Sequence, residues 1–175
     1  MKYLFVTLLT VFTVSYNSAQ NSITTTVPET MSVVDYSNTI TAEDLKTHLY
    51  IYAGDAMRGR MTGTKGQKLA AEYLRNFYQN QGIASPIEEN NYYQSIPSDY
   101  FGKSKNRGDS ENVVAYIEGS EKPNELIILS AHLDHVGTDK DGNVFNGADD
   151  DGSGTVALLE IAEAFQQAVK NGNGP

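Results

Sequence analysis

Two short stretches of the sequence combine side chains that bind divalent metals. The first contains His132, Asp134 and His135 directly after the apolar run 126–131. The second has three consecutive aspartates, 149–151, in a glycine-rich turn. Adjacent carboxylates repel one another unless a cation or the positive end of a helix compensates their charge, and a divalent cation compensates it far more strongly. Together the two stretches therefore indicate a metal site.

The residue types narrow the choice of metal and ligands. Imidazole nitrogens and carboxylate oxygens are ordinary zinc ligands, which makes His132 and Asp150 the candidate ligands. Asp134, two residues after His132, can orient the ring through its second nitrogen, as metal-bound histidines usually require. The sequence contains no cysteine, which excludes disulfides and thiolate ligands. Any metal must therefore be held by His, Asp and Glu side chains.

The same residues leave other interpretations open. The segment from Asp149 to Glu160 fits the spacing of an EF-hand loop, which would make the chain an exported calcium-binding module. An EF-hand also needs a helix entering its loop, and residues 137–147 have no helical period. Residues 130–135 approach the zinc motif of metallo-β-lactamase-like hydrolases, but Ser130 stands where that motif has its first histidine. A solvated acidic loop would not explain two histidines after an apolar run.

The surrounding pattern alternates between helices and strands. Apolar periodicity and capping residues predict helices from about Thr41 to Tyr52, from Thr64 to Gly82 and over 153–170. β-rich runs predict strands at 112–118 and 126–131, and the second is apolar almost throughout, like a strand buried on both faces. This alternation predicts an α/β fold with a sheet covered by helices. His132, Asp134 and His135 then follow the carboxyl end of a buried strand, where such sheets place ligands.

The connecting segments carry no predicted chemistry. In the loop from Arg58 to Gly63, the arginine side chains could be solvated or could bind a partner, and solvation is the expectation. Residues 90–111 are polar and turn-rich, which predicts an excursion on the surface.

The N-terminal residues and the net charge bear on where the chain acts. Lys2, the apolar run that follows it and small residues up to Ala19 form the pattern of a secretory signal peptide over residues 1–19. Residues 20–40 then predict an extended lead-in, and the protein is expected to be exported to a periplasm or to the medium. The net charge of -9 and the lack of a Lys/Arg cluster argue against nucleic acid and anionic membranes as partners.

The two stretches also resemble a known family. Ser-Ala-His-Leu-Asp-His-Val-Gly at 130–137, followed by Asn-Gly-Ala-Asp-Asp-Asp-Gly-Ser-Gly-Thr at 146–155 and an apolar helix, is similar to bacterial secreted aminopeptidases with two co-catalytic zinc ions. The resemblance extends upstream through 58–82 and 112–131. It implies a three-layer sandwich, with a mixed central sheet flanked by helices. Residues 41–175 would be the N-terminal portion of that zinc peptidase domain.

The resemblance also implies roles for the candidate residues. His132 would bind one zinc ion, Asp150 would bridge both ions, and Asp134 would be the active-site carboxylate that holds His132. The family's general base and its remaining ligands would lie beyond Pro175, so the isolated chain is expected to lack peptidase activity. The substrates would be peptides that lose their N-terminal residues, and carboxypeptidases or glutaminyl cyclases are alternatives on the same fold. No oligomeric state is predicted.

Overall fold

The computed structural model describes residues 31–102 and 107–175. The predicted signal peptide, 1–19, and the first part of the lead-in lie outside the described residues. The elements follow in the order α1 (Val33–Ser37), α2 (Ala42–Tyr52), η1 (Asp55–Arg60), α3 (Lys65–Gln81), β1 (Tyr93–Ile96), η2 (Ser98–Phe101), β2 (Ser110–Val113), η3 (Ala148–Gly152) and α4 (Ser153–Lys170).

The three long helices form where the sequence predicts them. The Thr41 hydroxyl accepts a hydrogen bond from the backbone N–H of Asp44, which caps the first turn of α2. Gly82 ends α3 in the left-handed conformation, with a φ of 72° that glycine adopts without steric cost. Helix α4 follows directly on η3 and ends at Lys170. Local apolar periodicity predicts all three helices, but of the three only α2 has a side-chain cap at its start. The Thr64 hydroxyl donates to the carbonyl of Met61 and makes no capping bond to α3.

Part of the predicted lead-in is helical rather than extended. Residues Val33–Ser37 form α1, a single short helix that begins after Ser32. The Ser32 hydroxyl accepts from the backbone N–H of Asp35, and the Asp35 carboxylate accepts from the backbone N–H of Ser32. This reciprocal capping box explains why the helix begins there.

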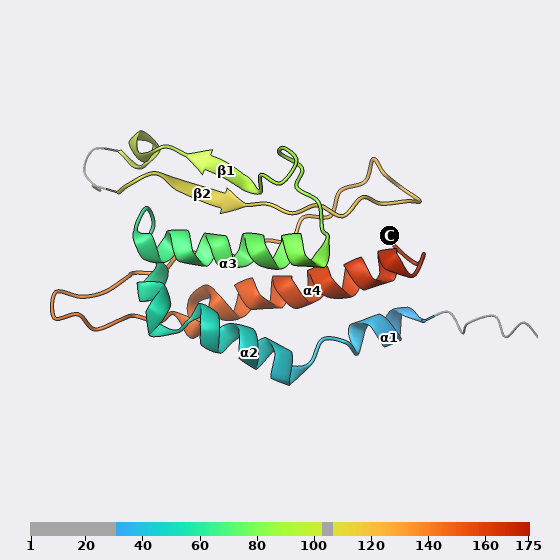
Figure 1. Cartoon of the computed structure of the whole chain (residues 1–175), viewed down its shortest axis with the longest axis horizontal. Coiled ribbons are helices and arrows are strands. Elements are labelled where there is room, and N and C mark those ends of the chain that lie inside the picture. The colour runs from blue at the N-terminus through green and yellow to red at the C-terminus, as the bar shows by residue number, and fades with distance from the viewer. Residues whose placement is uncertain (1–30, 103–106) are drawn as a thin grey trace, which may run out of the picture. The chain divides into compact units, whose positions relative to one another are not determined.

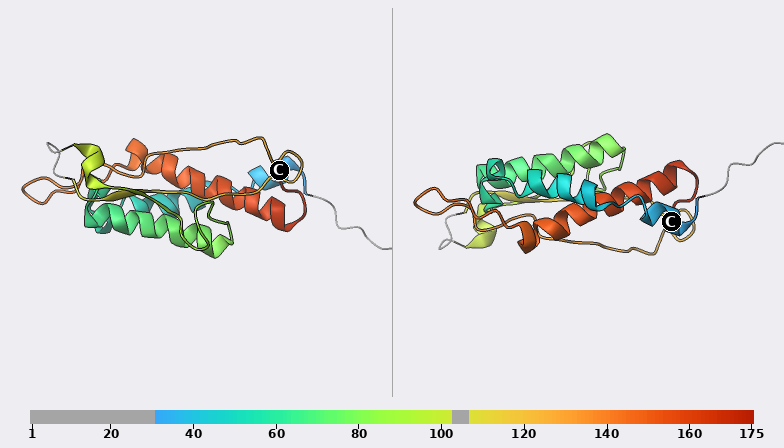
Figure 2. Two further views of the ribbon diagram at one scale, coloured as in Figure 1. Left: turned by 90° about the horizontal axis from the view of Figure 1, so that it is seen from above. Right: turned by 90° about the horizontal axis from the view of Figure 1, so that it is seen from below.

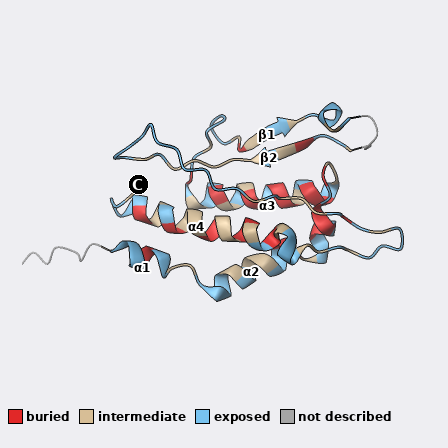
Figure 3. Ribbon diagram, turned by 180° about the vertical axis from the view of Figure 1, so that it is seen from behind, coloured by how far each residue is buried: buried red, intermediate tan, exposed pale blue. Residues whose placement is uncertain are grey.

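The apolar core lies between α3 and α4 and extends to α2. Figure 1 shows α3 between the two strands and α4, with α2 beyond α4. The buried residues concentrate on the facing sides of α3 and α4 (Figure 3). The core residues are Tyr52, Met57, Ala70, Leu74, Tyr78, Ile83, Tyr92, Val156 and Leu159.

The sheet of the described residues is a small antiparallel pair. Strands β1 and β2 pair with Tyr93 opposite Val113 and Ile96 opposite Ser110. The predicted surface excursion therefore contains β1 and the start of β2. Only the beginning of the predicted strand 112–118 lies in β2, although Tyr116 still donates to the carbonyl of Ala84 at 2.9 Å.

The prediction of a buried strand at 126–131 is wrong for this structure. The segment forms no strand, and the exposed fractions of Leu126, Ile127 and Ile128 are 70%, 91% and 83%. Figure 2 shows this part of the chain as an extended trace with no strand beside it. A buried parallel strand needs a partner strand whose backbone groups complete its ladder, and the described residues place none there.

At the level of fold class, the mixture of helices and sheet agrees with the predicted α/β character. A mixed central sheet between two helical layers is not formed by residues 31–102 and 107–175, so that finer arrangement remains a prediction. None of the helices in the described part of the chain is long and apolar enough to cross a membrane.

Candidate metal centre

The two predicted zinc ligands lie side by side. The Nε2 atom of His132 is 2.9 Å from Oδ1 of Asp150, although the residues are 18 positions apart in the sequence. The His132 side chain is about half exposed, and that of Asp150 is more exposed still. Zinc bound to both atoms at usual bond lengths and a tetrahedral angle would hold them about 3.4 Å apart. A small widening of the observed pair would therefore fit zinc.

The other nitrogen of the His132 ring is fixed by backbone. Nδ1 lies 2.9 Å from the carbonyl oxygen of Asp134, and because a carbonyl can only accept, Nδ1 carries the proton. This assigns Nε2 as the ligating atom of the neutral ring. The Asp134 carboxylate lies 3.8 Å from Nδ1, outside hydrogen-bond distance, so the carbonyl of Asp134 makes the orienting contact.

The carboxylate of Asp134 has a different partner. It accepts a hydrogen bond from the hydroxyl of Thr62, which itself lies 3.5 Å from Nη1 of Arg107. Thr62 is buried, and it belongs to the loop before α3. Asp134 is thus held through its side chain, while its backbone holds His132.

The start of α4 fixes the backbone of His132. The N–H of His132 donates to the carboxylate of Asp151 at 3.2 Å, and its carbonyl accepts from the hydroxyl of Thr155 at 3.1 Å. Element η3 is kinked at Asp150 and Asp151, whose peptide bond is cis. Through these contacts the turn presents Asp151 to the backbone of His132 and Asp150 to its ring.

His135 lies closer to the site than the sequence indicates. Its Nδ1 is 3.6 Å from Oδ2 of Asp150, and its side chain is mostly buried. The ring packs against Gly147, where a Cβ atom would lie 2.5 Å from Cγ of His135. The φ of Gly147 is 56°, so both the backbone conformation and the close contact require glycine. In the sequence, the position of His135 three residues after His132 is the sign of this proximity.

Hydrogen bonds and charge raise the pKa of His132. The largest cause is the hydrogen bond to the Asp134 carbonyl, and the carboxylates of Asp150 and Asp151 act in the same direction, while desolvation opposes them. The ring therefore holds its proton to a higher pH than a free histidine does.

The two arginines of the 58–63 loop differ in their exposure to solvent. Arg58 is exposed, as expected, whereas Arg60 is completely buried. The expectation that both are solvated is therefore wrong for Arg60. Its partners are backbone carbonyls, three of them 73 to 87 residues away, and carbonyls leave no recognisable pattern of side chains.

The calcium interpretation does not fit the geometry. Residues 137–147 contain no helix, so none enters the acidic loop. Glu160, which would close an EF-hand loop, is 4% exposed, and its Oε1 lies 3.2 Å from Nε2 of His48. This carboxylate belongs to a contact between helices and not to the aspartate turn.

The described residues supply a pair of ligands and no larger set. No group of three or more His, Asp or Glu side chains within 31–102 and 107–175 is arranged to hold a metal ion. The resemblance assigns two ligands to this part of the sequence, so a pair is what it leads one to expect here.

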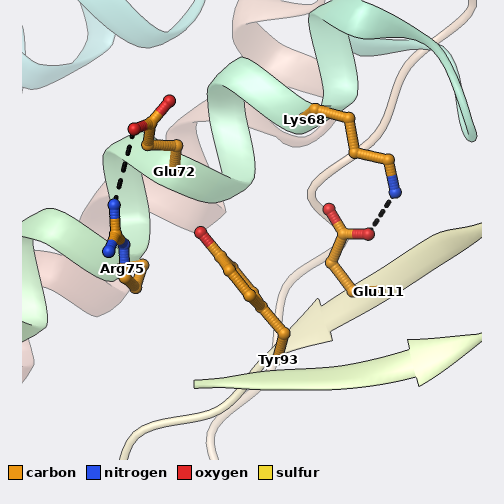
Figure 4. Close-up of a pocket in the computed structure, with 5 residues that line it drawn as sticks. All are labelled: Lys68, Glu72, Arg75, Tyr93 and Glu111. Atoms are coloured by element: carbon orange, nitrogen blue, oxygen red, sulfur yellow. Dashed lines mark hydrogen bonds and ion pairs between the residues drawn. The ribbon is translucent and has the colours of Figure 1, made fainter. Parts of the chain in front are cut away.

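An open hollow of about 420 Å³ lies elsewhere, between α3 and the strands. It is lined by Lys68, Glu72, Arg75, Tyr93 and Glu111 (Figure 4). Lys68 pairs with Glu111, and Arg75 pairs with Glu72. Its charges therefore satisfy one another, and it contains none of the candidate ligands.

Comparison with known proteins finds that the segment that carries the site matches a known family. Residues 112–173 match Peptidase family M28, whose peptidases are zinc-dependent, so the resemblance found in the sequence is confirmed. The chain is 34% identical over 116 residues to the Alkaline phosphatase isozyme conversion protein of Escherichia coli (strain K12), which covers 62% of this chain and 33% of that protein. It is 40% identical over 65 residues to the Probable glutamate carboxypeptidase LAMP1 of Arabidopsis thaliana, covering 37% of this chain and 8% of that protein.

These similarities cover only part of each relative's length. The chain spans about a third of the length of the Escherichia coli relative and less than a tenth of the Arabidopsis thaliana one. No solved structure matches the chain.

Proposed function

With residues 112–173 in Peptidase family M28 as the premise, we propose that the chain is part of an exported zinc aminopeptidase that removes N-terminal residues from peptides. The observation that carries the proposal is the contact between Nε2 of His132 and Oδ1 of Asp150 at 2.9 Å. In the complete enzyme, a three-layer sandwich of the kind the resemblance implies would surround this pair.

His132 and Asp150 would hold the zinc, with Asp150 shared between two ions. Bound zinc lowers the pKa of a water molecule and polarises the carbonyl of the scissile bond. The residues of this chain prepare the ligands for that role. The Asp134 carbonyl keeps the proton of His132 on Nδ1, and the Asp151 carboxylate fixes the backbone of His132. His135 lies beside the second oxygen of Asp150, with its Nδ1 3.6 Å from Oδ2.

A carboxypeptidase is the second candidate. The Arabidopsis thaliana relative is named a probable glutamate carboxypeptidase, which supports this candidate, and the metal ligands alone do not determine which end of a peptide is cleaved. Protein purified from the organism that encodes the chain can be assayed with aminoacyl p-nitroanilides and with N-acylated dipeptides. Zinc-dependent cleavage of the first substrate supports the aminopeptidase, and cleavage of the second alone contradicts it.

Export is part of the proposal and is supported by the signal-peptide pattern of residues 1–19. The location of the mature protein in the periplasm or in the medium can be read from fractionated cells.

Zinc binding by the 175-residue chain tests the metal centre directly. We expect the wild-type chain to bind zinc in competition with a chromophoric chelator. His132→Ala and Asp150→Asn should each weaken the affinity about tenfold or more, because each removes one of two ligands. Asp149→Asn is the matched control, since it removes the adjacent carboxylate and keeps Asp150, the carboxylate that contacts the His132 ring, and it should leave the affinity close to wild type. Equal affinities in all four proteins would show that the site is elsewhere.

A further inference from the structure

Arg60 is a buried cation that bonds only to backbone carbonyls. It ends η1, has a φ of 48° and has no exposed surface. Its guanidinium donates four hydrogen bonds of 2.7 to 3.0 Å, from Nε to the carbonyl of Leu133, from Nη1 to those of Tyr52 and Asn146, and from Nη2 to that of Gly147. The guanidinium also lies 4.6 Å from the centre of the Tyr52 ring.

In the part of the chain that the structure describes, the buried charge of Arg60 is stabilised by hydrogen bonds to carbonyls and not by an ion pair. Desolvation of a charged group is costly, and no carboxylate in the described residues makes an ion pair with the guanidinium. Burial lowers the pKa of Arg60, while the field of Tyr52 and Asp134 acts in the opposite direction. The rigid planar fork of an arginine can meet several carbonyls at fixed angles, which an ammonium group cannot do.

The acceptors of Arg60 flank the two candidate ligands. Leu133 directly follows His132, and Asn146 and Gly147 come just before the turn that carries Asp150. The backbone of Arg60 adds a further contact, because its carbonyl accepts from the N–H of His135 at 3.3 Å. One residue therefore contacts both segments whose relative position sets the distance between the ligands.

We propose that Arg60 is a positioning residue for zinc, whose guanidinium holds the segment of His132 and the segment of Asp150 together before the metal binds. The inference rests on the proposed zinc site. Without the guanidinium, part of the binding free energy of zinc would be spent on bringing the two segments together, and the affinity would fall. Contacts that orient metal ligands typically change metal affinity by about 10- to 100-fold.

The first experiment compares zinc affinity in Arg60→Lys, Arg60→Met and wild-type chains by chelator competition, with helix content followed by circular dichroism. We expect folded Arg60→Met to lose about 10- to 100-fold in affinity and Arg60→Lys to recover little of it. Arg58→Met is the matched control, because it removes the exposed arginine of the same loop and should bind zinc as the wild type does.

Chemical rescue separates positioning from general stability. Methylguanidinium added to Arg60→Ala should restore zinc affinity in proportion to its concentration, while tetramethylammonium at equal ionic strength should not. Recovery of the fold without recovery of affinity would overturn the inference. Folded Arg60→Met with wild-type affinity would also overturn it and leave the zinc site intact. A wild-type chain that fails to bind zinc would instead contradict the proposed function.

A measurement on the unmodified chain covers the case in which every variant unfolds. If Arg60 organises the site in advance, the Nε–H proton of Arg60 should exchange slowly with solvent in the metal-free protein, as observed by NMR. Slow exchange that is already present before zinc is added supports the inference. Fast exchange that becomes slow only after zinc is added would overturn it.

Discussion

At the residue scale, the ring of His132 faces two competing demands. The Asp134 carbonyl and the neighbouring carboxylates favour its protonated form, whereas zinc requires a neutral Nε2. The proton on Nε2 and the metal therefore compete for one atom. The raised pKa of His132 sets the pH range in which the proton competes with the metal.

We therefore expect zinc affinity to fall at low pH, beginning above the pH at which an ordinary histidine would lose it. Below the raised pKa of His132, each binding event releases about one proton, so the apparent affinity should decrease about tenfold per pH unit. Chelator competition across a pH series measures the slope, and NMR of the metal-free chain gives the pKa of His132. Zinc affinity that stays constant through that pKa would exclude His132 as a ligand.

The sequence predicts the ligand pair but not the residues that hold it. His132 and Asp150 are recognisable because imidazoles and carboxylates are the side chains that bind zinc, and the structure brings them together. The role of Arg60 cannot be recognised in this way, because every acceptor it uses is a carbonyl, which all residue types possess. An arginine with only such partners is indistinguishable in sequence from a solvated one.

At the scale of elements, a small polar cluster joins the three long helices. His48 of α2 lies with Nδ1 2.6 Å from the hydroxyl of Tyr73 on α3 and Nε2 3.2 Å from Oε1 of Glu160 on α4. Burial raises the pKa of Glu160, and the charges of Asp44 and Glu163 act in the same direction. The ionised form of Glu160 therefore costs stability in the folded state.

Glu160→Gln should remove this cost. Because the folded pKa of Glu160 is raised, its contribution favours folding at pH values below about 4.5, its ordinary pKa, and is lost as the pH rises through the raised value. The free energy of unfolding of Glu160→Gln should therefore exceed that of the wild type by an amount that grows with pH. At neutral pH the difference should be on the order of 1 kcal/mol.

Urea unfolding at several pH values measures this difference. Glu121→Gln, at an exposed position outside the helices, is the control, and it should lack the pH-dependent gain. If both variants follow the wild-type pH dependence, burial of Glu160 does not affect stability as described.

Helices and strands differ in how far the sequence predicts them here. The apolar periodicity of α2, α3 and α4 is a local property, so their bounds agree with the prediction to within a few residues. A strand is completed by partners elsewhere in the chain, and the composition of 126–131 cannot supply them. The same composition that indicates a buried strand therefore belongs, in the described structure, to an exposed extended segment.

At the scale of the whole molecule, that segment is an exposed apolar stretch. Leu126, Ile127 and Ile128 are consecutive and exposed, and no hydrogen bond joins 126–131 to another strand of the described residues. Unpaired backbone groups next to apolar side chains readily accept a further strand.

We expect the 175-residue chain to self-associate as its concentration rises. The double variant Ile127→Lys and Ile128→Lys should reduce association with little effect on stability, since both side chains are exposed. Size-exclusion chromatography with light scattering gives the molar mass at each concentration. Tyr100→Lys, at another exposed apolar position, is the control and should associate as the wild type does. A wild-type chain that stays monomeric at every concentration would contradict this expectation.

The position of Arg60 in the chain also has a consequence for the order of biosynthesis. Arg60 is synthesised 73 residues before Leu133 and 86 and 87 residues before Asn146 and Gly147, which supply three of its four acceptors. Until those residues have been synthesised, the guanidinium must stay hydrated. Helices α2 and α3 can form early from local contacts, but the charge between them becomes buried only after the ligand segments arrive. We therefore expect the chain to assemble its metal centre in one late step. In the same step, water leaves the surroundings of the Arg60 guanidinium.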